Sequence, residues 1–225
     1  MFVSPVWGLY SHRMAFLNDL VQSLLPTQCP LCSLVPDSPR RAGLCGPCES
    51  LVRGRLRMTT TPPSVVRCWT IGDYDGPHGA LVRLAKYGRS IRVADYLGLC
   101  LGVALKEVVE LMAVDAIVYV PVPPVRRMRR GFDQACRLAN EVSASIGVPV
   151  LNAVKRIDGR EQAGRTGSER RELGVHAFGL RAISLPDRIL VVDDVLTTGA
   201  TMNSVARVLR TAGVSHVFGA VIASP

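Results

Sequence analysis

The stretch Ile189–Met202, ILVVDDVLTTGATM, decides the fold of this 225-residue chain. Four apolar residues, typical of a buried strand, lead into two adjacent carboxylates, Asp193 and Asp194. Two neighbouring carboxylates repel each other and lose hydration, so they need hydroxyl donors, a metal ion or both. Behind them, the loop Thr197–Thr201 combines threonine hydroxyls with Gly199 and leads into a helix, an arrangement that favours phosphate binding. A ribose 5-phosphate would fit across the two features.

Other parts of the chain alternate between short apolar strands and amphipathic helices. We expect strands over residues 66–74, 116–122, 188–193 and 216–222, and helices beginning at Pro77 and covering residues 93–110, 132–146 and 201–212. Near-continuous apolar strands alternating with helices indicate a parallel sheet covered on both faces. The fold class is therefore α/β, and its ligands should bind at the carboxyl ends of the strands.

The composition is that of a globular protein with an anionic partner. Hydrophobic residues make up 48% of the chain, charged residues 20%, and the formal net charge is +9. This charge favours a phosphorylated metabolite, a nucleic acid or an acidic membrane surface. No apolar run approaches the roughly 20 residues of a transmembrane helix, and no secretory leader is visible, so we expect a cytoplasmic protein without a transmembrane segment.

Four segments follow from composition. Residues 1–26 form an N-terminal helix or extension, residues 27–57 a cysteine module, residues 58–65 a linker rich in threonine and proline, and residues 66–225 the main domain. Translation could start at Met1 or at Met14. The sequence does not determine an oligomeric state.

Four of the seven cysteines lie in one short window. Two C-x-x-C pairs, Cys29 with Cys32 and Cys45 with Cys48, are separated by twelve residues. Each pair offers two thiolates from a tight turn, and two pairs complete a tetrahedral zinc-ribbon-like site. Disulfides are the weaker explanation in a cytoplasmic protein. We expect a structural Zn²⁺ ion, and arginines nearby leave nucleic-acid binding by this module open.

The segment VVDDVLTTGAT resembles the motif with which type I phosphoribosyltransferases bind 5-phosphoribosyl-1-pyrophosphate (PRPP). The resemblance implies the type I phosphoribosyltransferase fold. It also implies that Asp193 and Asp194 are the catalytic-site acids that contact the ribose hydroxyls. The loop residues Thr197, Thr198, Gly199, Ala200 and Thr201 would then bind the 5-phosphate.

Three further segments narrow the family. The cysteine pairs, then YDGPHGALVRLAKYG, then VPVPPVRRMRRGFDQACRLA resemble the competence protein F-like (ComF-type) phosphoribosyltransferase-like proteins. Some members of that family are associated with DNA uptake. The resemblance covers nearly all of the chain after about Leu17.

Basic residues near the strand ends are candidates for the pyrophosphate of PRPP. They are Lys86 and, within the run RRMRR, Arg126, Arg127 and Arg130. A solvated charge run or a nucleic-acid patch is the alternative for the arginines. The segment Lys155–Phe178 resembles the flap that closes over the site in the family, and Gln162 and Arg170 match its pattern. Leu173 departs from the pattern, replacing an asparagine.

Three functions remain open from the sequence. The first is a glycosyltransferase that uses PRPP with Mg²⁺, in which pyrophosphate leaves the ribose C1 carbon and an acceptor that the sequence does not identify takes its place. The second is a single-stranded DNA-binding factor on the same fold, of the competence type. The third is a regulator that binds PRPP as a signal without turning it over.

Overall fold

The computed structural model describes residues 28–38, 40–157, 177–181 and 184–225. The chain divides into two compact units, residues 1–49 and 50–225. The extension predicted for residues 1–26 lies outside the described residues, and the predicted segment boundaries stay predictions.

The described part of the first unit is built from turns. The backbone N–H of Cys29 donates to the carbonyl of Leu34 at 2.7 Å, and that of Ser33 donates to the carbonyl of Cys29 at 2.8 Å. A short 3₁₀ turn, η1 (Arg41–Gly43), then precedes helix α2 (Gly46–Val52). These tight turns bring the two cysteine pairs together, as the spacing requires.

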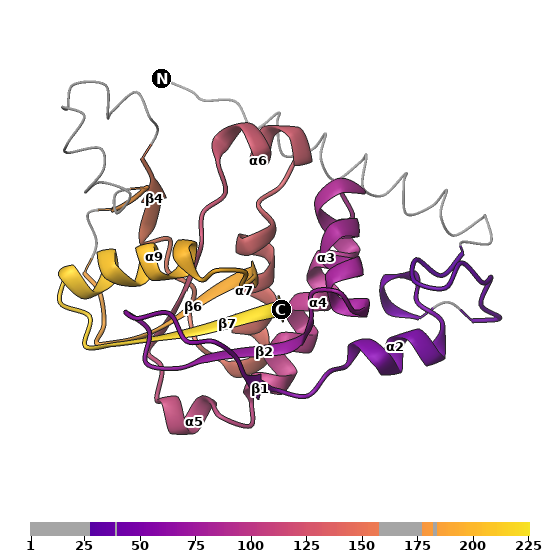
Figure 1. Ribbon diagram of the computed structural model, residues 1–225, viewed down its shortest axis with the longest axis horizontal. Helices are drawn as coiled ribbons and strands as arrows, with labels where there is room; N and C mark the ends of the chain where they lie inside the picture. The colour runs from indigo at the N-terminus through magenta and orange to yellow at the C-terminus, as the bar shows by residue number, and fades with distance from the viewer. Residues whose placement is uncertain (1–27, 39, 158–176, 182–183) are drawn as a thin grey trace, which may run out of the picture. The chain divides into compact units, whose positions relative to one another are not determined.

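The second unit contains the predicted parallel sheet (Figure 1). Its strands, in spatial order, are β1 (Arg57–Met58), β2 (Cys68–Asp73), β7 (His216–Ser224), β6 (Arg188–Val195) and β3 (Ala116–Tyr119). The last four run parallel, and β1 pairs antiparallel with β2 at one edge. The central strands β6 and β7 are buried along almost their whole length, as expected for a sheet covered on both faces.

Helices cover both faces of this sheet (Figure 1). The helices that follow β2 in the chain are α3 (Pro77–Tyr87), α4 (Ile91–Leu105), α5 (Val109–Met112), α6 (Pro124–Arg130), α7 (Gln134–Ile146) and α9 (Ala200–Thr211), and of these α3, α4, α7 and α9 pack on the sheet. On one face, apolar residues of α9 such as Met202 and Val205 pack against Ile189 and Val191 of β6. Helices α3, α4 and α7 pack on the sheet as well. Because strand residues alternate between faces, the even-numbered residues of β6 point away from α9.

Within the described residues, the structure has a helix in each range where one was predicted, but one of these ranges is divided in two. Residues 93–110 form two helices instead of one, because the backbone tightens after Leu105. The N–H groups of Lys106, Glu107 and Val108 donate to carbonyls three residues earlier, which is the geometry of a 3₁₀ turn and ends the α-helix.

Helices α4 and α7 pack closely because α4 carries two glycines one turn apart. A Cβ added at Gly98 would lie 3.0 Å from the Cα of Leu138, and one at Gly102 would lie 3.0 Å from the Cα of Val142. Only glycine therefore allows the two backbones to approach to this distance. The contact fixes α7, and with it the chain that enters α7 from α6.

Helix α6 and two short strands outside the main sheet are among the elements that were not expected from the sequence. The arginine run forms the short helix α6, and a small antiparallel pair, β4 (Val154–Arg156) and β5 (Phe178–Leu180), lies apart from the main sheet. This pair encloses most of the predicted flap segment in the sequence. The flap candidates Gln162 and Arg170 lie outside the described residues.

The described helices give no candidate for a membrane span, since none combines the length and the apolar character that a span requires.

Candidate functional site

The two aspartates occupy the carboxyl end of β6. The strand runs two residues further than the sequence indicated, to Val195, so both aspartates belong to it. Asp194 is only 8% exposed, Asp193 is partly buried, and the N–H of Asp194 donates to the Asp193 carboxylate at 2.8 Å. Because successive strand residues point to opposite faces, the carboxylates extend to different sides of the sheet. The two carboxyl groups therefore differ in their direct contacts, although the charge of Asp194 still acts on Asp193.

Asp194 forms an ion pair with Lys86. The Nζ atom of Lys86 lies 2.7 Å from Oδ1 of Asp194, although the two residues are 108 positions apart in the sequence. Lys86 is in the last turn of α3, so this contact connects the carboxyl end of β6 to the end of that helix. Most of both side chains is shielded from water, which strengthens the attraction between them.

Asp193 is the less readily ionised member of the pair. Desolvation of its carboxyl group and the neighbouring charge of Asp194 raise the pKa of Asp193 to about 8, against the favourable charge of Lys86. At neutral pH much of this carboxyl group holds its proton. A cation or a set of hydroxyl donors at this position would stabilise the charged form.

The predicted phosphate loop lies between β6 and α9. Gly199 has a φ angle of +74°, a left-handed conformation, and α9 begins at the next residue. Thr197, Thr198 and Thr201 are exposed, and the N–H of Ala200 approaches the Thr198 hydroxyl at 3.4 Å. The first N–H groups of a helix have no partner within the helix, so this turn offers donors to an anion.

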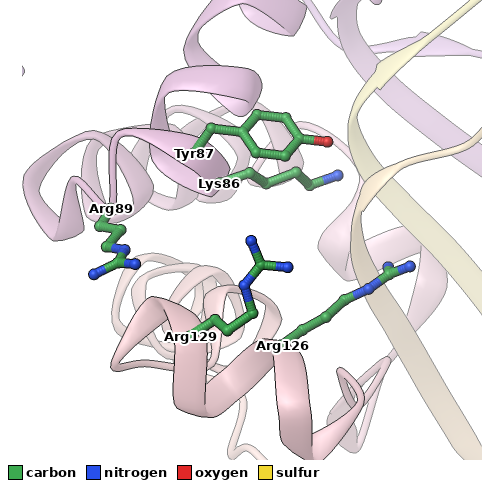
Figure 2. Close-up of a pocket in the computed structure, with 5 residues that line it drawn as sticks. All are labelled: Lys86, Tyr87, Arg89, Arg126 and Arg129. Carbon is green, nitrogen blue, oxygen red and sulfur yellow. The ribbon is translucent and has the colours of Figure 1, made fainter.

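Basic side chains surround a cavity of about 330 Å³ between α3 and α6 (Figure 2). Its described lining consists of Lys86, Tyr87, Arg89, Arg126 and Arg129, with no acidic residue among them. In Figure 2 the guanidinium group of Arg129 extends from α6 toward Lys86 and Tyr87 of α3. Lys86 is paired with Asp194, but the three arginines have no acidic partner within the described lining, and their positive charge favours an anionic ligand there.

Some of the residues predicted to bind pyrophosphate line this cavity, and others do not. Lys86 and Arg126 line the cavity. Arg127 is on α6 but is not part of the lining, and its charge acts on Asp133, where it opposes the rise in pKa that burial causes. The structure does not describe the side chain of Arg130.

Of the other lining residues, Arg129 belongs to the basic run RRMRR, in which at least one arginine was expected to contact the pyrophosphate. Arg89 and Tyr87 were not singled out, although both are close to Lys86 in the sequence. Arg89 lines the cavity from just past the end of α3, with a φ angle of +52° that few non-glycine residues adopt. No local pattern in the sequence predicts such a turn.

The four cysteines of the first unit are clustered. Their Sγ atoms all lie within 4.8 Å of one another, and those of Cys32 and Cys45 are 3.7 Å apart. A tetrahedral site with Zn–S bonds of about 2.3 Å separates its sulfur atoms by about 3.8 Å. Burial opposes ionisation of Cys29, but hydrogen bonds from backbone N–H groups outweigh it and lower its pKa to about 6. The cluster could therefore hold a structural zinc ion.

Comparison with known proteins gives the same family as the sequence motifs do. Residues 128–224 match the phosphoribosyl transferase domain family. The chain is 32% identical to competence protein F of Haemophilus influenzae over 164 residues, which cover 69% of this chain and 71% of that protein. This chain belongs to the competence protein F-like family of phosphoribosyltransferase-like proteins.

Two other relatives in this family have related names. Competence protein ComFC of Streptococcus pneumoniae is 32% identical over 44% of each chain. DNA utilization protein YhgH of Salmonella typhimurium is 27% identical over 86% of this chain and 95% of its own. The family assignment confirms the type I phosphoribosyltransferase fold expected from the sequence.

The raised pKa of Asp193 predicts a pH-dependent effect of Asp193→Asn on stability. An aspartate in the unfolded chain loses its proton near pH 4, whereas the folded protein keeps this proton up to about pH 8. The stabilisation from the bound proton is therefore present below pH 4 and is lost as the pH rises to about 8. Asparagine does not titrate, so the variant should exceed the wild type in melting temperature by several degrees more at pH 8.5 than at pH 5. Thermal unfolding at the two pH values measures this, and equal differences would contradict the raised pKa.

Proposed function

We propose that this protein binds PRPP with Mg²⁺ at the carboxyl end of the sheet. The observation that carries the proposal is the ion pair between Lys86 and Asp194, because it joins the acidic strand end to the cationic cavity. The loop between β6 and α9 continues the chain from the same strand end. An acidic group, a phosphate loop and a cationic cavity in this order correspond to the ribose hydroxyls, the 5-phosphate and the pyrophosphate of PRPP.

Each group of residues would have its own task. Asp193 and Asp194 would accept hydrogen bonds from the ribose hydroxyls and orient the sugar. Lys86, Arg126 and Arg129 would neutralise charge that develops on the pyrophosphate as it leaves C1. Carboxylate oxygens together with phosphate oxygens are the ligands that Mg²⁺ prefers, and the bound ion would supply further charge neutralisation. Whether an acceptor then takes the ribosyl group separates a transferase from a PRPP-sensing regulator.

Removing both carboxylates should greatly weaken PRPP binding. We expect the wild type to bind PRPP in the presence of Mg²⁺, and Asp193→Asn/Asp194→Asn to bind it at least about 100-fold more weakly, because two charge-assisted hydrogen bonds are lost. Calorimetric titration measures both. Asp187→Asn is the matched control, since it removes a carboxylate just before the amino end of β6 and should bind as the wild type does.

The outcomes separate the functional classes. A wild type that does not bind PRPP would refute both the transferase and the sensor. If PRPP binds, pyrophosphate release is followed against a panel of bases and amines. Release with one of them identifies a transferase and its class of acceptor, and no release with any of them favours the sensor.

Single-stranded DNA binding is a second candidate, which the relatives' names favour: competence protein F and DNA utilization protein YhgH. The described surface supports it with the exposed arginines Arg126 and Arg129 on α6 and with Tyr87, a residue that is 78% exposed. Arginines attract the phosphate backbone, and an exposed aromatic ring can stack on a base. The DNA-binding surface would then include the lining of the cationic cavity.

Arg126→Ala/Arg129→Ala tests this second function through its salt dependence. If both arginines contact phosphates of single-stranded DNA, the slope of log K against log salt concentration should become shallower by about 1.4. Binding is measured by fluorescence anisotropy at several salt concentrations. Lys106→Ala/Arg207→Ala removes the same charge elsewhere on the surface and should keep the wild-type slope. An unchanged slope in the first variant would show that Arg126 and Arg129 do not contact the phosphates of the DNA.

We also propose that the cysteine cluster binds a structural zinc ion. The wild type should contain about one zinc per chain by elemental analysis, and Cys48→Ser should lose most of it because the proposed site would lose one of its four thiolates. Cys136→Ser is the control and should retain the metal, because Cys136 is on α7 of the second unit and outside the cluster. A wild type purified with no zinc, and unable to take it up, would argue against the site.

A further inference from the structure

The segment Thr59–Val66, which includes most of the predicted linker, is fixed to the sheet at both ends. At its start, the N–H of Thr59 donates to the carbonyl of Cys68 at 3.0 Å, and its hydroxyl donates to that of Ser224 at 2.9 Å. At its end, the N–H of Val66 donates to the carbonyl of Val217 at 2.7 Å. Val65 is buried in the core between the sheet and α9. We call this segment the strap.

The middle of the strap is a tight turn. The N–H of Val65 donates to the carbonyl of Pro62 at 2.9 Å, so Pro62 and Val65 are the first and last residues of a four-residue turn. Pro63 is its second residue, where the fixed φ angle of proline favours the turn. Two prolines and the anchored ends leave the strap few alternative conformations.

Pro62 packs against the predicted phosphate loop. It is buried, and a Cβ added at Gly199 would lie 3.0 Å from its Cγ atom. Gly199 is the residue whose left-handed conformation turns the loop into α9. The proline ring therefore occupies the space beside the loop at the residue on which the shape of the loop depends.

Asn203 holds the strap from the other side. Its Oδ1 atom accepts a hydrogen bond at 2.9 Å from the N–H of Ser64, a group within the turn of the strap. Its own N–H donates to the carbonyl of Gly199 at 2.8 Å. One residue in the first turn of α9 thus contacts both the strap and the phosphate loop.

We propose that Pro62 and Asn203 are positioning residues that hold the loop Leu196–Thr201 in the shape that binds phosphate. The inference rests on the proposed function, in which this loop takes the 5-phosphate of PRPP. Neither residue needs to touch the ligand. Backbone N–H groups bind an anion well only when they already point to one place, so fixing Gly199 increases affinity by reducing the ordering that binding requires.

The test compares two probes that address different parts of the site. Ribose 5-phosphate reports on the phosphate loop, and inorganic pyrophosphate with Mg²⁺ reports on the cationic cavity. In Pro62→Ala and in Asn203→Ala, the Kd for ribose 5-phosphate should rise by about 3- to 10-fold, the effect of one lost hydrogen bond or packing contact. The Kd for pyrophosphate should stay within about twofold of the wild type. Both are measured by calorimetry on the full chain.

A double variant and a control exclude a merely structural role. Because the two residues fix one loop, the effects in Pro62→Ala/Asn203→Ala should be smaller than the sum of the single effects. Arg207→Ala, an exposed change on the same helix, should leave both Kd values unchanged. Thermal unfolding of every variant checks that it remains folded.

The possible results separate the inference from the proposed function. A wild type that binds neither ribose 5-phosphate nor PRPP would overturn the proposed function itself. If the wild type binds ribose 5-phosphate and each single variant binds it as tightly as the wild type does, the proposed function stands and the inference is overturned. An equal loss for both probes would also overturn it, because the effect would then not be confined to the phosphate loop.

Discussion

The parallel pairing of β6 with β3 on one side and β7 on the other is the constraint on which the rest of the site depends. Parallel strands end at the same edge of a sheet, so everything that follows β2, β3, β6 and β7 collects there. The pairing requires strands that are buried on both faces, and Leu190, Val191 and Val192 are almost inaccessible to water. The same apolar run that stabilises the sheet therefore brings two carboxylates to the edge where these strand ends meet.

The alternation of side chains along β6 then separates the two acids. Asp194 meets Lys86 on the side away from α9, and Asp193 remains poorly solvated beside it with a raised pKa. One strand end thereby presents a paired carboxylate and a largely protonated one. Hydroxyl groups of a sugar and a bound cation would stabilise the charged form of both carboxyl groups. The proposed ligand, PRPP with Mg²⁺, would supply both.

Lys86 also lines the cationic cavity, together with Arg89, Arg126 and Arg129. Helix α6 follows β3, and α3 follows β2, so two crossover connections bring their basic residues to opposite walls of one cavity. The arginines of its lining repel one another, whereas Lys86 is paired with Asp194. A pyrophosphate or a nucleic-acid backbone would relieve this repulsion, and for that reason the same lining supports both proposed functions.

The α/β class, the acid pair with the glycine-containing turn behind it, the clustering of the cysteines and the family could all be predicted from the sequence alone. These depend on local patterns: apolar runs of strand length, a glycine in a tight turn, and two C-x-x-C pairs. Only the tertiary structure decided that Asp194 pairs with Lys86, that Arg89 and Tyr87 line the cavity with Arg129, and that Pro62 supports Gly199. Such contacts join residues far apart in the chain or depend on a rare backbone angle. Their geometry is set by how strands and helices pack, which no short stretch of sequence encodes.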